Sequence, residues 1–243
     1  MITHAVIFAP LGQATRSEQV VERLSNAIVS GLLEAHEQLP NESDLAKLMG
    51  VSHITIREAL NTLREKALIY TTRGRNGGSF ICELATSRED QHPLKNMTNN
   101  YLADLGEMHC AVMKHSVGLA VRHSTQKDIQ KLNEFIISFK HAVSPEQKAQ
   151  ADMRCLLTIA AHAQSPRLAH HALVLQTEWA SLVAVLYRNE NIYQKMMGYY
   201  DDLVASFFDQ NEVFATHLIG EMLTYLTEEL IDQRFKVEQS CLE

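Results

Sequence analysis

The fold of the N-terminal part of this chain is decided by residues 39–60, which read LPNESDLAKLMGVSHITIREAL. Asn41 can cap a first short helix, because its side chain can accept a hydrogen bond from a free backbone N–H. Gly50 can supply a tight turn, and Ser52 can cap a second helix that runs from about residue 53 to residue 66. Two short helices joined by a tight turn predict a helix-turn-helix.

The second of these helices carries two different faces. Its apolar face is expected to pack in the core and contains Ile56, Ala59, Leu60 and Leu63. Steps of four, four and three residues keep the polar side chains on one stripe, which consists of His53, Arg57, Asn61 and Arg64. A DNA major groove admits one such helix and is read by hydrogen-bonding side chains. The hydroxyls of Ser52 and Thr55 lie where the helix begins, a position that suits a phosphate.

A basic, glycine-rich turn follows at residues 73–78, which read RGRNGG. It separates two short runs, 67–72 and 79–82, that are typical of strands, so the sequence predicts a β-hairpin. Arginines at its tip can reach phosphates or an adjacent minor groove, and the glycines let the backbone approach closely. We therefore expect this hairpin to be the wing of a winged helix-turn-helix, with DNA contacts from Arg73, Gly74, Arg75 and Gly77.

The rest of the chain is interpreted as helical. Apolar residues repeat at helical spacing over residues 17–33, which predicts a helix before the motif. Residues 84–96 are polar and suggest a linker, and five breaks in the pattern after residue 97 predict six or seven helices and no strand. The predicted fold is mainly α. A winged helix-turn-helix domain at 13–83 and a linker at 84–96 precede an all-helical bundle domain at 97–240.

Composition limits the class of protein. A hydrophobic content of 46% allows a real core and argues against global disorder. The first residues lack the basic start and apolar run of a signal peptide, and no apolar stretch reaches the ~20 residues of a membrane span. The four cysteines form no CxxC pair. We expect a cytoplasmic protein with reduced cysteines and no membrane partner.

The formal net charge of −7 argues at first against a DNA-binding protein. Its distribution matters more than its sum, because residues 13–83 hold eight Lys or Arg against nine Asp or Glu and are nearly neutral. DNA contact must then come from a local basic patch. From the polar stripe alone, a helical hairpin with a solvated charged face is an equal alternative. The ordered combination of cap, turn, helix and basic hairpin favours DNA binding.

Both stretches resemble a known family. Residues 39–60 and the run RGRNGGSFI at 73–81 resemble the GntR family of bacterial regulators, and the likeness extends without a gap from about residue 17 to residue 81. The helical remainder is similar to the FadR-type (FCD) effector domain. The resemblance implies a transcription repressor or activator rather than an enzyme. It also implies DNA contacts at Ser52, His53, Thr55 and Arg57, and a wing tip around Gly74 and Gly77.

Two positions depart from the family pattern. The family usually has Arg where His53 stands and often has Arg where Ser43 stands. Two fewer fixed positive charges are expected to weaken phosphate attraction or to change the operator. A protonated His53 can still donate a hydrogen bond, so operator affinity is expected to depend on pH. An affinity that stays flat from about pH 6 to 8 would contradict this hypothesis.

The resemblance also bears on metal binding. Many FCD domains hold a divalent metal with an Asp, a His four residues later and two further His. The matching positions here are Asp152, Leu156, Tyr200 and Met222, so only the Asp is retained. Leucine offers no donor atom and methionine is a soft, weak ligand. We expect no metal at this site and no other cofactor.

The effector pocket of the family would also have a different lining. The family tends to carry an Arg and a Glu on the first helix of this domain, where His109 and Met113 stand. Loss of charge favours an apolar or acyl-type effector over a small dicarboxylate. The candidate effector pocket consists of His109, Met113, Asp152, Leu156, Tyr200 and Met222.

Twelve histidines leave room for a rival metal site and a metal-dependent enzyme. His162, His170 and His171 follow Asp152, but their spacings do not place them on one helix face. We interpret most of the histidines as surface or core residues. The sequence shows no nucleophile elbow, Walker loop or HExxH motif.

The sequence therefore predicts a homodimer that binds a two-fold symmetric double-stranded DNA operator. A small-molecule effector in the helical domain would change the operator affinity. The alternative is a constitutive DNA-binding regulator or scaffold whose C-terminal domain is degenerate and ligand-free. A cavity with convergent polar groups favours sensing, and a solid core favours the alternative.

Overall fold

The computed structural model describes residues 7–8, 16–29, 31–74, 77–83, 92–95 and 97–240, with residues 16 and 240 described by backbone only. The chain divides into two compact units, Met1–Ser87 and Arg88–Glu243. Of the predicted linker at 84–96, only residues 92–95 lie among the described residues, so its extent stays a prediction.

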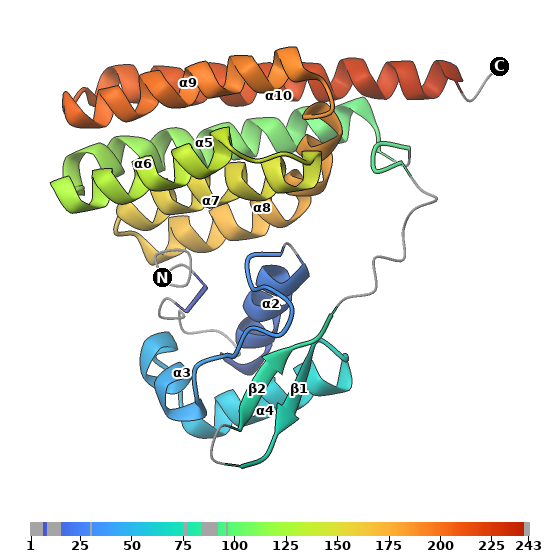
Figure 1. The fold of residues 1–243 in the computed structure, drawn as a ribbon, viewed down its shortest axis with the longest axis vertical. Coiled ribbons are helices and arrows are strands. Elements are labelled where there is room, and N and C mark those ends of the chain that lie inside the picture. Colours follow the sequence, from blue (N-terminus) through green and yellow to red (C-terminus); the bar gives the residue numbers. More distant parts are fainter. Residues whose placement is uncertain are drawn as a thin grey trace. The chain divides into compact units, whose positions relative to one another are not determined.

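In the N-terminal unit, helices α2, α3 and α4 come first and a β-hairpin follows them, in the order predicted for a winged helix-turn-helix (Figure 1). The hairpin follows the third described helix directly, as a wing does. The elements are α2 (Arg16–Val29), α3 (Glu42–Met49), α4 (His53–Glu65), β1 (Ile69–Thr72) and β2 (Gly78–Ile81).

Helix α2 is shorter than the predicted helix at 17–33. It is described to Val29, and Gly31 then adopts a left-handed φ of 73° that turns the chain away from the helix axis. The Gly31 N–H still donates to the Ile28 carbonyl at 3.0 Å. Leu32 lies outside the helix but is only 3% exposed. Its apolar side chain therefore indicates that it is buried, and does not indicate that the helix continues to this residue.

The wing pairs as an antiparallel hairpin, with Ile69 opposite Ile81 and Thr72 opposite Gly78. A further pairing was not predicted. Gln38 forms a bridge with Phe80 on the other edge of β2, so the segment after α2 extends the small sheet. One bridging residue leaves no alternating pattern, which is why the sequence gives no strand signal there.

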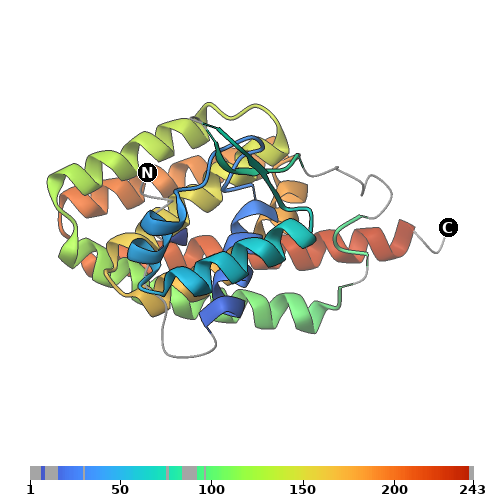
Figure 2. The same cartoon turned by 90° about the horizontal axis from the view of Figure 1, so that it is seen from below.

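The helices of the N-terminal unit share one apolar core. Leu24 of α2, Leu45 and Met49 of α3, and Ile56 and Leu63 of α4 are all 0% exposed. Figure 2 shows α3 and α4 next to one another, and both are packed through these side chains. The buried face of α4 is the one predicted, so its opposite face points to solvent.

The second unit is all-helical within the described residues, as predicted. Its helices end at the predicted breaks, because each break supplies a Ser, Thr or Asn cap whose side chain accepts a backbone N–H of the next helix. The helices are α5 (Asn99–His123), α6 (Gln126–Lys140), α7 (Pro145–His162), α8 (Pro166–Leu186), α9 (Glu190–Phe208) and α10 (Glu212–Ser240).

Short connections make consecutive helices of this unit run antiparallel. Figure 1 shows α9 and α10 along one side of the bundle, α7 and α8 along the other, and α5 and α6 between them. Helix α5 packs along α10 and α7, and α6 packs against α7 and α9. The interior is filled by large side chains, with Phe139, Trp179, Tyr187 and Tyr200 each at most 1% exposed.

Candidate DNA-binding surface and the helical interior

Helix α4 begins with a cap that leaves its first turn open to solvent. The Ser52 hydroxyl accepts the Thr55 N–H at 3.1 Å and lies 2.8 Å from the Thr55 hydroxyl. Gly50 closes α3 in a left-handed conformation, with φ at 65°. The turn therefore presents the Ser52 and Thr55 hydroxyls together at the N-terminus of α4, where the helix dipole attracts an anion.

The predicted polar stripe lies on the face of α4 away from the core. His53, Arg57 and Asn61 are exposed, and Arg64 is half-buried beside β1. Ile56 and Leu63, on the opposite face, are 0% exposed. The stripe is thus a continuous solvent-facing surface of hydrogen-bonding side chains.

Arg57 is held by an acidic partner on the neighbouring helix. Its Nε and Nη2 both donate to one carboxylate oxygen of Glu42, at 3.2 and 3.1 Å. The two side chains are 66% and 40% exposed, so the pair adds little to stability. Its effect is geometric, because it fixes the direction of a guanidinium that would otherwise sample many rotamers.

Arg64 connects α4 to the wing. Its Nη1 donates to the Thr71 hydroxyl on β1 at 3.0 Å, and its Nη2 donates to the Asn61 carbonyl oxygen. The hairpin is therefore tied to α4 by a side chain of the stripe itself. Asn61 and Arg64 act as one hydrogen-bonded pair.

The wing tip depends on two glycines. Gly74 has a φ of 119°, a conformation that side-chain-bearing residues rarely adopt. A Cβ on Gly77 would lie 2.5 Å from the Thr72 carbonyl oxygen, so no larger residue fits there without moving the backbone. Arg73 is exposed beside them, and predicted site residue Arg75 lies outside the described residues.

Sequence reasoning missed Glu42 and Thr71, the partners of the two stripe arginines. Glu42 lies within the diagnostic stretch, but it is 15 residues from Arg57 and no short-range rule pairs them. Thr71 is only seven residues from Arg64. Their contact depends on how the hairpin folds back, which the spacing does not specify.

In the helical unit, His109 lies in a buried polar cluster. The Gln176 amide nitrogen donates to its Nε2 at 2.8 Å, and the Trp179 ring stands edge-on with centroids 4.6 Å apart. Burial lowers the pKa of His109 to about 3, so the ring is neutral with its proton on Nδ1. Three buried atoms of this cluster have no hydrogen-bond partner among the described residues: His109 Nδ1, Gln176 Oε1 and Trp179 Nε1.

A second buried cluster surrounds Asp152. The Tyr200 hydroxyl donates to Asp152 Oδ1 at 2.5 Å. Burial raises the pKa of Asp152 to about 7, although the Tyr200 hydrogen bond opposes the rise. Burial also raises the pKa of Tyr187, and the neighbouring Asp152 carboxyl raises it further. An acid and two phenols are thus buried together, and no cation among the described residues shifts the pKa of Asp152.

The other three positions of the candidate pocket are apolar and covered. Met113 and Leu156 are 0% exposed and Met222 is 1% exposed. All six candidate side chains are buried in the helical unit, and a hydrogen bond joins Asp152 to Tyr200.

These residues do not fit the metal site of the FCD domains described above. The one carboxylate accepts a tyrosine hydroxyl, and the positions of the other ligands hold Leu156, Tyr200 and Met222. Over the described ranges, no three His, Cys, Asp or Glu side chains are grouped to hold a metal ion. His162 is buried, and its Nε2 lies 3.9 Å from Asp128. Among the residues described, no helix is long and apolar enough to cross a membrane.

Two family models match the chain. One is described as bacterial regulatory proteins of the gntR family and matches residues 16–81. The other is the FCD domain and matches residues 104–224. The first range holds α2 to β2, and the second holds most of the helical bundle.

Curated proteins similar to this chain include regulators of transcription. The chain is 36% identical over 174 residues to the "Putative HTH-type transcriptional regulator RmpR" of Mycobacterium gastri, which covers 71% of this chain and 64% of that protein. It is 31% identical over 169 residues to the "Putative L-lactate dehydrogenase operon regulatory protein" of Escherichia coli (strain K12), covering 66% of this chain and 61% of that protein. The match therefore spans less than two thirds of either relative.

Among solved structures, Escherichia coli McbR/YncC is similar in fold. The TM-score is 0.53 with 18% sequence identity, and the match covers 91% of this chain and 99% of that chain. At this identity the likeness concerns the fold alone.

Proposed function

Because the chain belongs to the gntR family of bacterial regulatory proteins and carries an FCD domain, we propose that it is a transcriptional regulator that binds a double-stranded DNA operator. The observation that carries this proposal is the outward stripe of α4, capped by Ser52 and flanked by the basic wing. The stripe supplies Arg57 for base edges or phosphates and the helix start supplies free N–H groups for a phosphate. The cytoplasm is the compartment where such a protein meets its operator.

We propose that the protein acts as a homodimer. One α4 helix reads only a few base pairs, and two copies related by a two-fold axis would read two half-sites in successive major grooves. The net charge of −7 adds a reason for two copies to bind together, because a single N-terminal unit gains little from long-range attraction to DNA.

The helical domain is proposed to hold a small-molecule effector that shifts operator affinity. Support comes from the buried atoms of the His109 cluster that have no hydrogen-bond partner among the described residues. Each unsatisfied buried polar group costs on the order of 1–3 kcal/mol, so a ligand that pairs with several of them would be favoured. Neutral His109 and the apolar Met113, Leu156 and Met222 suit an apolar or acyl-type compound with few polar atoms.

A specific observation favours the second candidate, a constitutive regulator or scaffold with a ligand-free helical domain. The six candidate pocket residues are between 0% and 1% exposed, so the interior around them is filled. Native mass spectrometry of the purified chain separates the two proposals. A stoichiometric small molecule, or a ligand found by screening that changes operator affinity, supports the sensor, and neither would be found for the scaffold.

Arg57→Ala tests DNA binding. The operator is first selected from a random duplex library with the full chain, and affinity is then measured by fluorescence anisotropy at several salt concentrations. Loss of one guanidinium contact should weaken binding about 10- to 100-fold and reduce the salt slope by about one.

Arg122→Ala is the matched control for this test. Arg122 is also an exposed arginine paired with a glutamate, Glu212, at 2.9 Å, but it lies on α5. Its removal should leave operator affinity unchanged. Equal affinities of the wild type and Arg57→Ala would show that α4 is not the reading helix.

A further inference from the structure

An isoleucine stands on the outermost line of the recognition helix. Ile54 is 69% exposed, whereas Ile56, two residues later, is 0% exposed. At 3.6 residues per turn, Ile54 lies almost opposite the middle of the buried face formed by Ile56, Ala59, Leu60 and Leu63. Its side chain therefore has no packing role in the core of its own unit.

The surroundings of Ile54 are polar. Ser52 and His53 precede it and are exposed, and Arg57, one turn later on the same side, is directed by Glu42. Single exposed apolar residues are common on protein surfaces. This one differs by its place, because the first turn of a recognition helix is the part that contacts base edges.

The floor of the major groove offers one apolar group, the 5-methyl group of thymine. A branched aliphatic side chain can cover that methyl group but cannot satisfy the amino and carbonyl groups that other bases present. We propose, on the basis of the DNA-binding function above, that Ile54 contacts a thymine methyl group in each half-site and so sets a preference for a T·A pair there. Burial of one methyl group corresponds to about a fourfold change in affinity.

Uracil, which lacks only this methyl group, provides the test. The full chain selects its operator from a random duplex library, and each thymine of the selected sequence is then replaced in turn by deoxyuridine. Wild-type affinity should fall about fourfold at one thymine position per half-site and stay constant elsewhere. Ile54→Ala should bind the thymine operator about as weakly as the wild type binds the uracil operator, and should not distinguish the two.

Controls separate the methyl contact from other effects. Ile54→Val should retain part of the discrimination, and thermal melting should show that the variants are folded, since the side chain is mostly exposed. Val213→Ala shortens an 81% exposed side chain on α10 and should keep full uracil sensitivity. The salt slope should match that of the wild type in Ile54→Ala, because no charge is removed.

Three results would overturn the inference. Wild-type affinity that is indifferent to uracil at every thymine would exclude the methyl contact. Uracil sensitivity that persists in Ile54→Ala would assign it to another residue. If the library yields no preferred sequence, the proposed DNA-binding function fails as well, whereas the first two results leave that function intact.

Discussion

Burial acts in opposite directions on two side chains of the helical bundle. It raises the pKa of Asp152 to about 7 and lowers the pKa of His109 to about 3. In the unfolded chain these groups titrate near their ordinary values of about 3.9 and 6.5. The folded state therefore binds an extra proton at Asp152 between about pH 4 and 7, and lacks one at His109 between about pH 3 and 6.5. The two effects on stability oppose one another over most of this range.

The variant Asp152→Asn should separate the contribution of Asp152 to the pH dependence of stability from that of His109. A group whose folded pKa is raised destabilises the fold as pH rises from its unfolded to its folded pKa, here from about 4 to about 7, and is then constant. Asparagine can still accept the Tyr200 hydrogen bond but cannot ionise. The stability of Asp152→Asn relative to the wild type should therefore increase with pH up to about 7.

Urea unfolding followed by tryptophan fluorescence measures this difference, because the single tryptophan, Trp179, is buried in the helical unit. Asp202→Asn, at an exposed position of α9, is the control and should show no such trend. A stability difference for Asp152→Asn that does not vary between pH 4 and 7 would refute the assignment of a neutral, buried acid.

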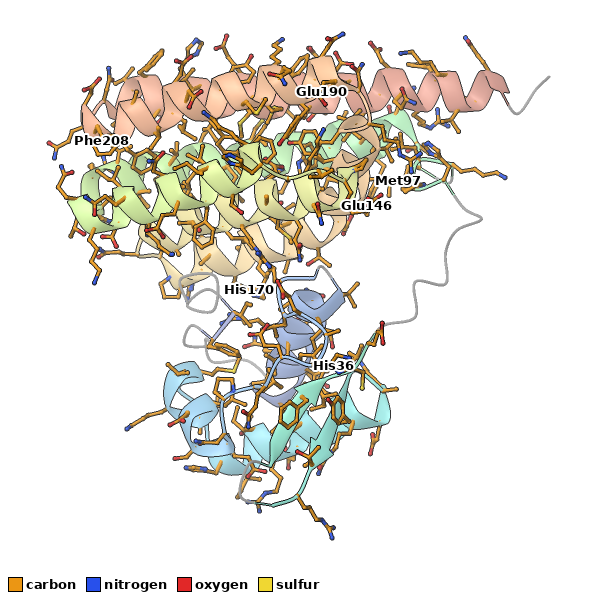
Figure 3. The ribbon with its side chains drawn as sticks, in the orientation of Figure 1. His36, Met97, Glu146, His170, Glu190 and Phe208 are labelled. Atoms are coloured by element: carbon orange, nitrogen blue, oxygen red, sulfur yellow. The ribbon has the colours of Figure 1, made fainter. Side chains whose placement is uncertain are left out.

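Among the elements, the wing is the one whose shape depends most on glycine. Gly74 provides the left-handed backbone of the turn, and Gly77 leaves room for the carbonyl of Thr72. The hairpin is also paired on its other edge through Gln38 and tied to α4 through Arg64. A distorted tip would therefore disturb both the sheet and the contact between β1 and α4. Figure 3 shows the side chains that fill each unit, with His36 labelled beside the sheet.

Gly77→Ala should loosen the wing. A Cβ at 2.5 Å from a backbone oxygen forces the chain to shift, which costs about 1–3 kcal/mol. Faster amide exchange over residues 67–83 and weaker operator binding are the expected results. Gly198→Ala is the matched control, because its Cβ meets nothing within 4 Å on α9. There the change should be neutral or stabilising by about 0.5–1 kcal/mol. Equal exchange rates in Gly77→Ala and the wild type would contradict a tightly closed turn.

At the scale of the whole molecule, we propose that the N-terminal unit binds DNA and that the chain assembles as a dimer. A dimer would place two α4 helices on one operator and double the small electrostatic gain of each N-terminal unit. In light scattering, the full chain should therefore have a mass of twice 27.4 kDa. Its footprint on the selected operator should show two half-sites about one DNA turn apart, roughly 34 Å. A chain that stays at 27.4 kDa and protects a single half-site would contradict the dimer proposal.

Local features of the fold could be predicted because they depend on neighbouring residues. The Ser52 cap of α4 and the caps at the breaks between the helices of the bundle involve side chains and backbone groups only two or three residues apart. Hydrophobic spacing also identified the buried face of α4 correctly. The end of α2 was wrong by several residues, because Leu32 is buried by tertiary packing and not by helix formation.

The sequence by itself determined the winged helix-turn-helix, the helical bundle, the family and the outward stripe of α4, since caps, turns and amphipathic spacing are short-range. Tertiary structure alone decided which groups meet. Glu42 pairs with Arg57, which is 15 residues away in the sequence. Tyr200 and Asp152 are 48 residues apart, and Gln176 and His109 are 67 residues apart. These contacts depend on how helices pack, and burial in that packing shifts the pKa of Asp152 and of His109. No pattern along the chain encodes either effect.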